Sequence, residues 1–104
     1  MSSVDIGTLA DFDQGVPRQL KIDGRILVAV RIDDEVFVLD DRCSHEEFYL
    51  SDGEVDVETK EIECERHGSM FRLSDGAAVT LPATKPVAHY DVLERDGRLE
   101  VVLP

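Results

Sequence analysis

The dipeptide Asp-Gly recurs along this chain, at positions 23–24, 52–53, 75–76 and 96–97. It suits the type I′ turn of a two-residue β-hairpin, because both central residues of that turn have positive φ angles. Short segments rich in β-branched and aliphatic residues lie between these turns, at 18–22, 25–32, 35–40, 87–94 and 98–103. Within the second segment, Ile26, Val28, Val30 and Ile32 alternate with other residues and should share one face of a strand. We therefore predict an all-β fold, with short antiparallel strands in a sandwich or barrel-like arrangement.

The length of 104 residues predicts a single domain over 1–104, with room for one modest core. The longest uninterrupted apolar run, residues 26–30, is far too short to span a membrane. The first residues contain acids rather than Lys or Arg and have no long apolar stretch, so they do not resemble a signal peptide. We expect a cytoplasmic protein without a membrane partner.

The formal net charge of -12 argues against nucleic acid and anionic membrane surfaces as partners. Acidic residues gather between positions 46 and 63, where Lys60 is the one cation. The acids of this segment are Glu46, Glu47, Asp52, Glu54, Asp56, Glu58, Glu61 and Glu63. Two interpretations remain open: this charge only keeps the protein in solution, or it forms a docking face for a basic partner.

Both cysteines of the chain are followed closely by a histidine. Cys43 and His45 form a Cys-x-His pair, and after a gap of 18 residues Cys64 and His67 form a Cys-x-x-His pair. Both pairs fall on predicted loops at strand ends, where a rigid sheet usually holds its functional residues. The third histidine, His89, lies within a predicted strand without such a neighbour, so we expect a structural role for it.

Three kinds of chemistry use cysteine and histidine together. A thiol nucleophile with a histidine base needs only one pair, so the duplication favours four ligands that converge on one centre. Two Cys and two His satisfy tetrahedral zinc, although zinc sites usually pair the two cysteines in one tight knuckle. A [2Fe–2S] centre with two thiolates on one iron and two imidazoles on the other also needs this ligand set.

The segments "CSH" (43–45) and "CERHG" (64–68) resemble the Rieske family motif, Cys-x-His followed after a gap by Cys-x-x-His-Gly. The likeness extends to "LSDG" (50–53), "HGSMFRLSDG" (67–76) and the proline-bearing "LPATKPVAHYDV" (81–92). The resemblance implies a Rieske-like fold, an antiparallel β-sandwich base with a small cluster-binding subdomain. Its two cluster-binding loops would cover about 41–50 and 62–72.

The same resemblance implies one Rieske-type [2Fe–2S] cluster per chain. Cys43 and Cys64 would bind the inner iron, and His45 and His67 the outer, more exposed iron. Electrons would enter and leave near the two histidines, where partner proteins dock.

Departures from the family pattern narrow the class of Rieske protein. Phe48 and Arg66 stand where respiratory relatives have two further cysteines joined in a disulfide, and the chain shows no membrane anchor. It also has no room for the second, mononuclear-iron domain of oxygenase large subunits. We therefore expect a monomeric ferredoxin that is not itself an enzyme. It would carry electrons from a flavoprotein NAD(P)H reductase to a terminal oxygenase, such as an aromatic-ring-hydroxylating dioxygenase.

Other roles remain open at this point. The chain could be a permanently held subunit of another multicomponent reductase, similar to the nitrite reductase small subunit, or serve iron–sulfur assembly. A more remote alternative is a Cys₂His₂ zinc module for protein binding.

Two neighbours of the second pair bear on the reduction potential. Ser69 resembles the serine that donates a hydrogen bond to a bridging sulfide in high-potential relatives, whereas Phe71 replaces a tyrosine donor. The acidic surroundings disfavour the negative charge added on reduction. We expect a low potential, raised slightly by Ser69. The apolar side chains of Phe48, Tyr49 and Met70 would shield the cluster or form a docking patch.

Overall fold

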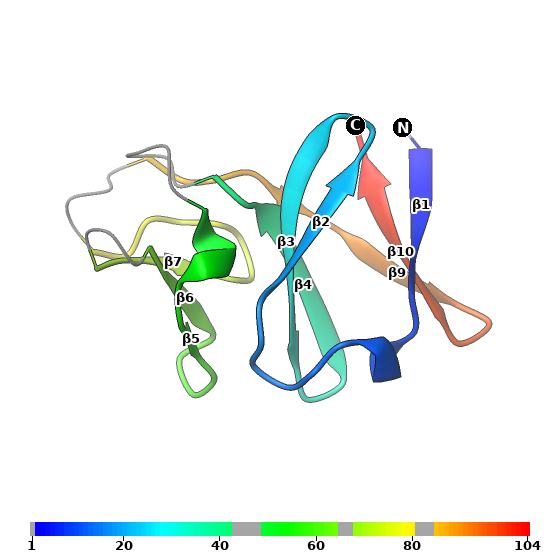
Figure 1. Ribbon diagram of the computed structural model, residues 1–104, viewed down its shortest axis with the longest axis horizontal. Coiled ribbons are helices and arrows are strands. Elements are labelled where there is room, and N and C mark those ends of the chain that lie inside the picture. Colours follow the sequence, from blue (N-terminus) through cyan, green and yellow to red (C-terminus); the bar gives the residue numbers. More distant parts are fainter. Residues whose placement is uncertain (1, 43–48, 65–67, 81–84) are drawn as a thin grey trace.

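The computed structural model describes residues 2–42, 49–64, 68–80 and 85–104, which form three antiparallel sheets (Figure 1). The first sheet has the order β1 (Ser2–Gly7), β10 (Arg98–Leu103), β9 (Val92–Arg95). The second has the order β2 (Arg18–Ile22), β3 (Arg25–Ile32), β4 (Glu35–Asp40), β8 (His89–Tyr90). The third and smallest has the order β5 (Val55–Asp56), β6 (Glu61–Cys64), β7 (Ser69–Arg72). Within these residues the only helices are two 3₁₀ turns, η1 (Leu9–Asp11) and η2 (Leu50–Asp52), and no helix could span a membrane.

The predicted all-β class is confirmed, and the strands at 18–22, 25–32, 35–40 and 98–103 have the predicted bounds. The prediction of one strand over 87–94 is wrong. The chain changes sheets at Asp91, so that β8 pairs with β4 while β9 pairs with β10. Such a change depends on which strand edges are available for pairing, and the local sequence does not show it. The strands β1, β5, β6 and β7 were not predicted.

The Asp-Gly turns divide into two groups. Positive φ angles at both residues confirm the turn prediction at 23–24 (50° and 77°) and at 96–97 (52° and 79°). The hairpin prediction at 52–53 is wrong, because Gly53 has an extended conformation (φ -93°) at the end of η2. At 75–76 only Gly76 has a positive φ, so that turn is not type I′.

Strand β3 is buried on both faces, because the second sheet packs against both of the others. Of the four residues predicted to share a face, Val28, Val30 and Ile32 lie in one hydrophobic cluster with residues of β6 and β7. The fourth, Ile26, is only partly buried and is not in that cluster. Leu27 and Ala29, on the opposite face, lie in a second cluster with residues of β10. The first two sheets thus form the predicted β-sandwich base, and the small sheet β5–β7 adds a subdomain against its other side (Figure 1).

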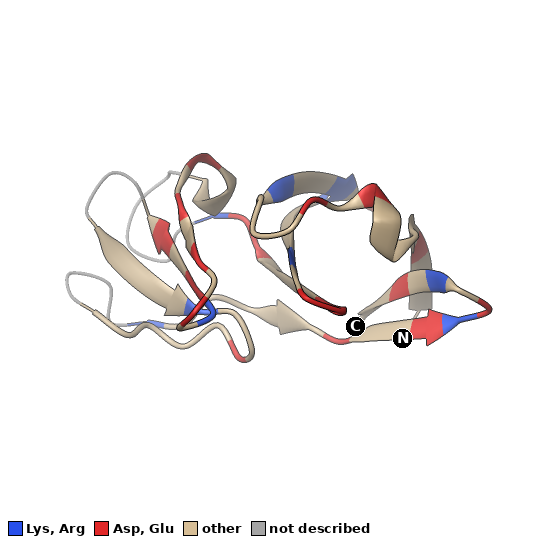
Figure 2. Cartoon of the chain, turned by 90° about the horizontal axis from the view of Figure 1, so that it is seen from below, with Lys and Arg blue, Asp and Glu red and all other residues tan. Residues whose placement is uncertain are grey.

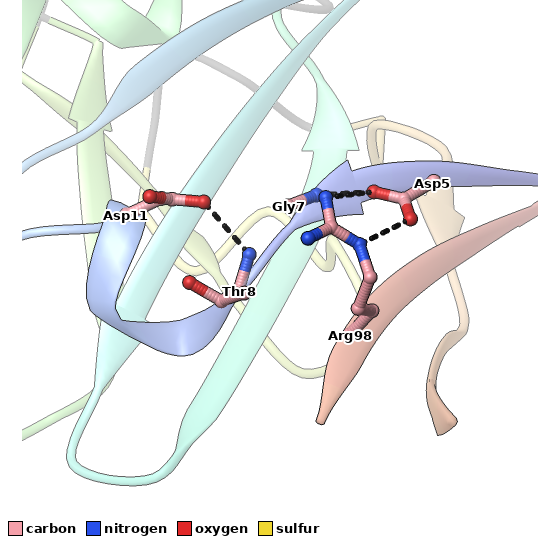
Figure 3. Close-up of polar contacts among 5 residues, drawn as sticks. All are labelled: Asp5, Gly7, Thr8, Asp11 and Arg98. Carbon is pink, nitrogen blue, oxygen red and sulfur yellow. Dashed lines mark hydrogen bonds and ion pairs between the residues drawn. The ribbon is translucent and has the colours of Figure 1, made fainter. Parts of the chain in front are cut away.

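Polar side-chain contacts lie at the end of the N-terminal strand and at the turn that follows it (Figure 3). Arg98 of β10 donates to the Asp5 carboxylate of β1 at 2.6 and 3.0 Å, and this lowers the pKa of Asp5. The Thr8 N–H donates to Asp11 at 2.8 Å, which lowers the pKa of that carboxyl. Such exposed pairs add little stability, and β1 is held on β10 by the backbone ladder between the two strands.

Candidate metal centre

Of the four predicted ligands, the structure describes Cys64. It is the last residue of β6, its side chain is fully buried, and burial alternates along the strand so that Ile62 shares its face. Cys43, His45 and His67 lie outside the described residues. The convergence of the four side chains is therefore still a prediction.

The segment that carries Cys43 and His45 starts and ends at residues that pair with each other. Arg42 and Tyr49 form an antiparallel bridge. One step further out, the Leu50 N–H donates to the carbonyl oxygen of Asp41 at 2.5 Å. The two ends of segment 43–48 are therefore held together at the edge of the sandwich base.

The segment that carries His67 is the loop of the β6–β7 hairpin. Cys64 and Ser69 are directly opposite in this hairpin, and the Gly68 N–H donates to the carbonyl oxygen of Cys64 at 2.9 Å. Opposite residues in an antiparallel pair project from the same face. The Ser69 side chain, also fully buried, thus lies on the same face of the hairpin as the sulfur of Cys64.

Turn η2 brings the described chain that follows segment 43–48 against β6, the strand that leads into the second segment. It follows segment 43–48 directly and packs on β6, just before Cys64. A Cβ on Gly53 would overlap the carbonyl oxygen of Glu63 and lie 2.9 Å from its carbon. The approach requires glycine for lack of space, since the φ angle of Gly53 is ordinary. The two ligand segments thus start from neighbouring parts of the backbone.

Cys64 lies in an apolar cluster whose other members include Leu50, Ile62, Phe71 and Leu73. A thiolate is unfavourable in such surroundings unless a cation compensates its charge, so the site fits a metal-bound sulfur. A nucleophilic thiol has to reach its substrate, and Cys64 has no exposed surface. Phe71 is fully buried beside it and offers no hydroxyl donor.

The turn after β7 is hydrogen-bonded to the proline-bearing segment 81–92. Val87 donates its N–H to the carbonyl oxygen of Gly76 at 2.9 Å. Asp75 stabilises the turn by accepting from the Ala77 N–H (3.0 Å) and pairing with Arg72 (3.1 Å). These two contacts, the Ala77 hydrogen bond foremost, lower the pKa of Asp75.

Sequence analysis singled out His89 but did not single out Asp41. His89 is an exposed residue of β8, and its expected structural role stays a prediction. Asp41 was not predicted to matter. Within the part of the chain that the structure describes, Asp41 and Ser69 are the two fully buried polar side chains. The available signal was an acidic residue directly between a buried strand and the first ligand segment.

We predict that Ser69→Ala lowers the midpoint potential of the bound cluster by roughly 60 mV. Loss of one hydrogen bond to a charged acceptor costs on the order of 1.4 kcal/mol, a tenfold change in a one-electron equilibrium. The expectation combines the family resemblance with the burial of Ser69 opposite Cys64. Redox titration measures the shift, with Ser74→Ala on the exposed turn as control. An unchanged midpoint in Ser69→Ala would contradict the prediction.

Comparison with known protein families matches residues 2–91 of the chain to the Rieske [2Fe-2S] domain. Among curated proteins, the 3-phenylpropionate/cinnamic acid dioxygenase ferredoxin subunit of Photorhabdus laumondii is 32% identical over 103 residues. The match covers 99% of this chain and 96% of that protein.

Solved structures show the same likeness. The ferredoxin of carbazole 1,9a-dioxygenase from Nocardioides aromaticivorans superposes with a TM-score of 0.93 at 36% identity, over 97% of each chain. A ferredoxin chain in a complex of reduced oxygenase and oxidized ferredoxin in carbazole 1,9a-dioxygenase gives a TM-score of 0.88 at 27% identity. That match covers 95% of this chain and 91% of that one. The fold expected from the two Cys/His motifs is thereby confirmed.

Proposed function

The chain belongs to the Rieske [2Fe-2S] domain family, and we propose that it is the ferredoxin component of an oxygenase system. It is a one-electron carrier rather than a catalytic subunit. The main support for this proposal is the likeness to ferredoxin subunits of dioxygenases, which extends over nearly the full length of both chains. The proposed donor is a flavoprotein reductase that uses NAD(P)H, and the proposed acceptor is a terminal oxygenase. The complex of an oxygenase with a similar ferredoxin supports the acceptor.

The proposed cluster ligands are Cys43, His45, Cys64 and His67, from loops at about 41–50 and 62–72 of a single domain. When bound, the Rieske [2Fe-2S] cluster supplies reversible one-electron chemistry. The chain contributes a buried sulfur at Cys64, and around it an apolar cluster that excludes water. We also propose a cytoplasmic location, in accord with the proposed nicotinamide-dependent donor.

Partners are proposed to dock near His45 and His67. Two described residues lie close to these histidines in the sequence. Of these, Tyr49 is 40% exposed and Met70 is half-buried. A groove of about 500 Å³ runs from Met70 along β5 and β6, and its acidic lining residues are Glu54, Asp56, Glu58 and Glu63. Acidic residues (red) lie along the strands and turns of this small sheet in Figure 2. This charge favours the second of the two interpretations, a docking face for a basic partner.

We expect the double variant Glu46→Lys/Glu47→Lys to slow reduction of the ferredoxin by its reductase at low salt, by about tenfold. Reversal of two charges beside His45 weakens the long-range attraction of a basic partner. The structure does not describe these two residues, so the expectation rests on their place in the sequence. Anaerobic stopped-flow mixing with the NAD(P)H-reduced reductase measures the rate.

A matched control carries the same charge change on the base. Glu94 lies on β9 and Glu100 on β10. Their sheet packs on one face of the second sheet, and β5–β7 packs on the other face. Glu94→Lys/Glu100→Lys should leave the rate close to that of the wild type. Equal rates for both double variants, or rates that do not respond to salt, would rule out steering by this face. Failure of every flavoprotein reductase to reduce the wild type would rule out the proposed donor.

A further inference from the structure

Asp41 is fully buried, although charged side chains seldom are. Its carboxylate accepts hydrogen bonds from two residues. Ser51 donates its N–H to Oδ1 and its hydroxyl to Oδ2, both at 2.6 Å, and the Gln19 amide donates to Oδ2 at 2.7 Å. Acceptance from three donors by two oxygens matches the acceptor-only character of a carboxylate. Asp41 is therefore the centre of a compact hydrogen-bonded network.

This network joins three parts of the fold that are distant in sequence. Gln19 belongs to β2 of the base, Asp41 directly follows β4, and Ser51 belongs to η2. The backbone of Asp41 adds two hydrogen bonds. Its N–H donates to the carbonyl oxygen of Ile26 (3.0 Å), and its carbonyl oxygen accepts from the N–H of Leu50. The entry and exit of segment 43–48 are thereby bound to the same carboxylate and to the base sheet.

The network also reaches the strand of the second ligand segment. Ser51 lies in η2, which packs on β6 through the close approach of Gly53 to Glu63, one residue before Cys64. One residue, Arg42, separates Asp41 from Cys43, so two steps along the chain span at most about 7 Å. A buried negative charge at this place disfavours a further negative charge nearby, because water does not screen the repulsion.

We propose that Asp41 is a positioning residue for the metal centre. Through Gln19 and Ser51 it fixes the base of segment 43–48, and its buried charge lowers the reduction potential of the cluster bound there. The proposal rests on the ligand set given under the proposed function. A purely structural role for Asp41 predicts altered stability, but no directed shift in potential.

The test compares variants of the full chain that contain the bound [2Fe–2S] cluster. Asp41→Asn keeps the shape, and its carbonyl can still accept the Ser51 N–H, while the charge is lost. We expect an upward shift of the midpoint potential with the reduced electron paramagnetic resonance signal retained. The matched control is Asp40→Asn, which removes a charge from the neighbouring, half-buried residue whose side chain accepts from Tyr90. Its upward shift should be smaller because solvent screens the Asp40 charge.

A second pair of variants tests positioning without removing the charge. Ser51→Ala and Gln19→Leu each delete one donor to Asp41 and should release iron to a chelator several-fold faster than the wild type. An Asp41→Asn midpoint that is unchanged, lower, or shifted no more than that of Asp40→Asn overturns the electrostatic half of the proposal. Wild-type release rates in both donor variants overturn the positioning half. A wild-type protein that binds no [2Fe–2S] cluster would instead refute the proposed function.

Discussion

Replacement of Cys64 by alanine is expected to abolish cluster binding. The wild type should contain two irons and acid-labile sulfide per chain, as the Rieske [2Fe-2S] composition requires. Cys64→Ala removes a thiolate that lies, fully buried, at the end of β6, and no neighbouring side chain of the apolar cluster can replace it as a ligand. Iron, sulfide and visible absorbance should fall to background levels. The melting temperature should fall as well, because metal binding contributes to folding free energy.

Ile62→Val is the matched control for this variant. Ile62 is fully buried on the same face of β6, two residues earlier, and loss of its methylene costs about 1 kcal/mol. The control should keep the full iron content and colour. Full iron content in Cys64→Ala would refute the role of Cys64 as a ligand. A colourless wild type with one bound zinc would refute the cluster itself.

Gly76→Ala is expected to destabilise the protein by about 3 to 5 kcal/mol. An added Cβ would overlap the carbonyl oxygen of Val87 and lie 3.1 Å from its carbon. The φ angle of 75° adds a separate cost of about 1 to 2 kcal/mol for a residue with a side chain. Relief of the overlap requires the two segments to separate, which breaks the hydrogen bond from the Val87 N–H to Gly76.

Gly97→Ala isolates the contribution of the overlap. Gly97 has nearly the same φ, 79°, but a Cβ there would meet nothing within 4 Å. It should therefore cost only about 1 to 2 kcal/mol. Thermal unfolding of the loaded proteins, followed by circular dichroism, should place Gly76→Ala on the order of 10 °C below Gly97→Ala. Equal melting temperatures would show that the chain around Val87 moves aside at little cost.

Local patterns predicted the parts of the fold that short segments determine. The bounds of β2, β3 and β4 follow from alternation and β propensity, and the turns at 23–24 and 96–97 from the positive φ angles that Asp-Gly accepts. Strands β5 and β6 were missed although acidic and apolar residues alternate there, because the two strands are only two and four residues long. The spacing of the Cys/His pairs predicted the family and its cofactor, which the comparisons confirm.

The same dipeptide gave different structures at different places, which shows the limit of local signals. Asp52-Gly53 has the sequence of a hairpin turn, yet it ends a 3₁₀ turn because Gly53 packs against the backbone of β6. Likewise, alternation predicted which residues of β3 share a face, but it did not show that the two flanking sheets bury both faces.

By itself, the sequence predicted the chemistry of this protein, because the types, number and spacing of the proposed ligands are properties of the covalent chain. The tertiary structure decided how that chemistry is held. The change of sheets at Asp91, the close approach of Gly76 to Val87 and the burial of Asp41 among donors from β2 and η2 all depend on contacts between distant segments. No local pattern encodes such contacts, because each exists only once the packing of the three sheets brings its partners together.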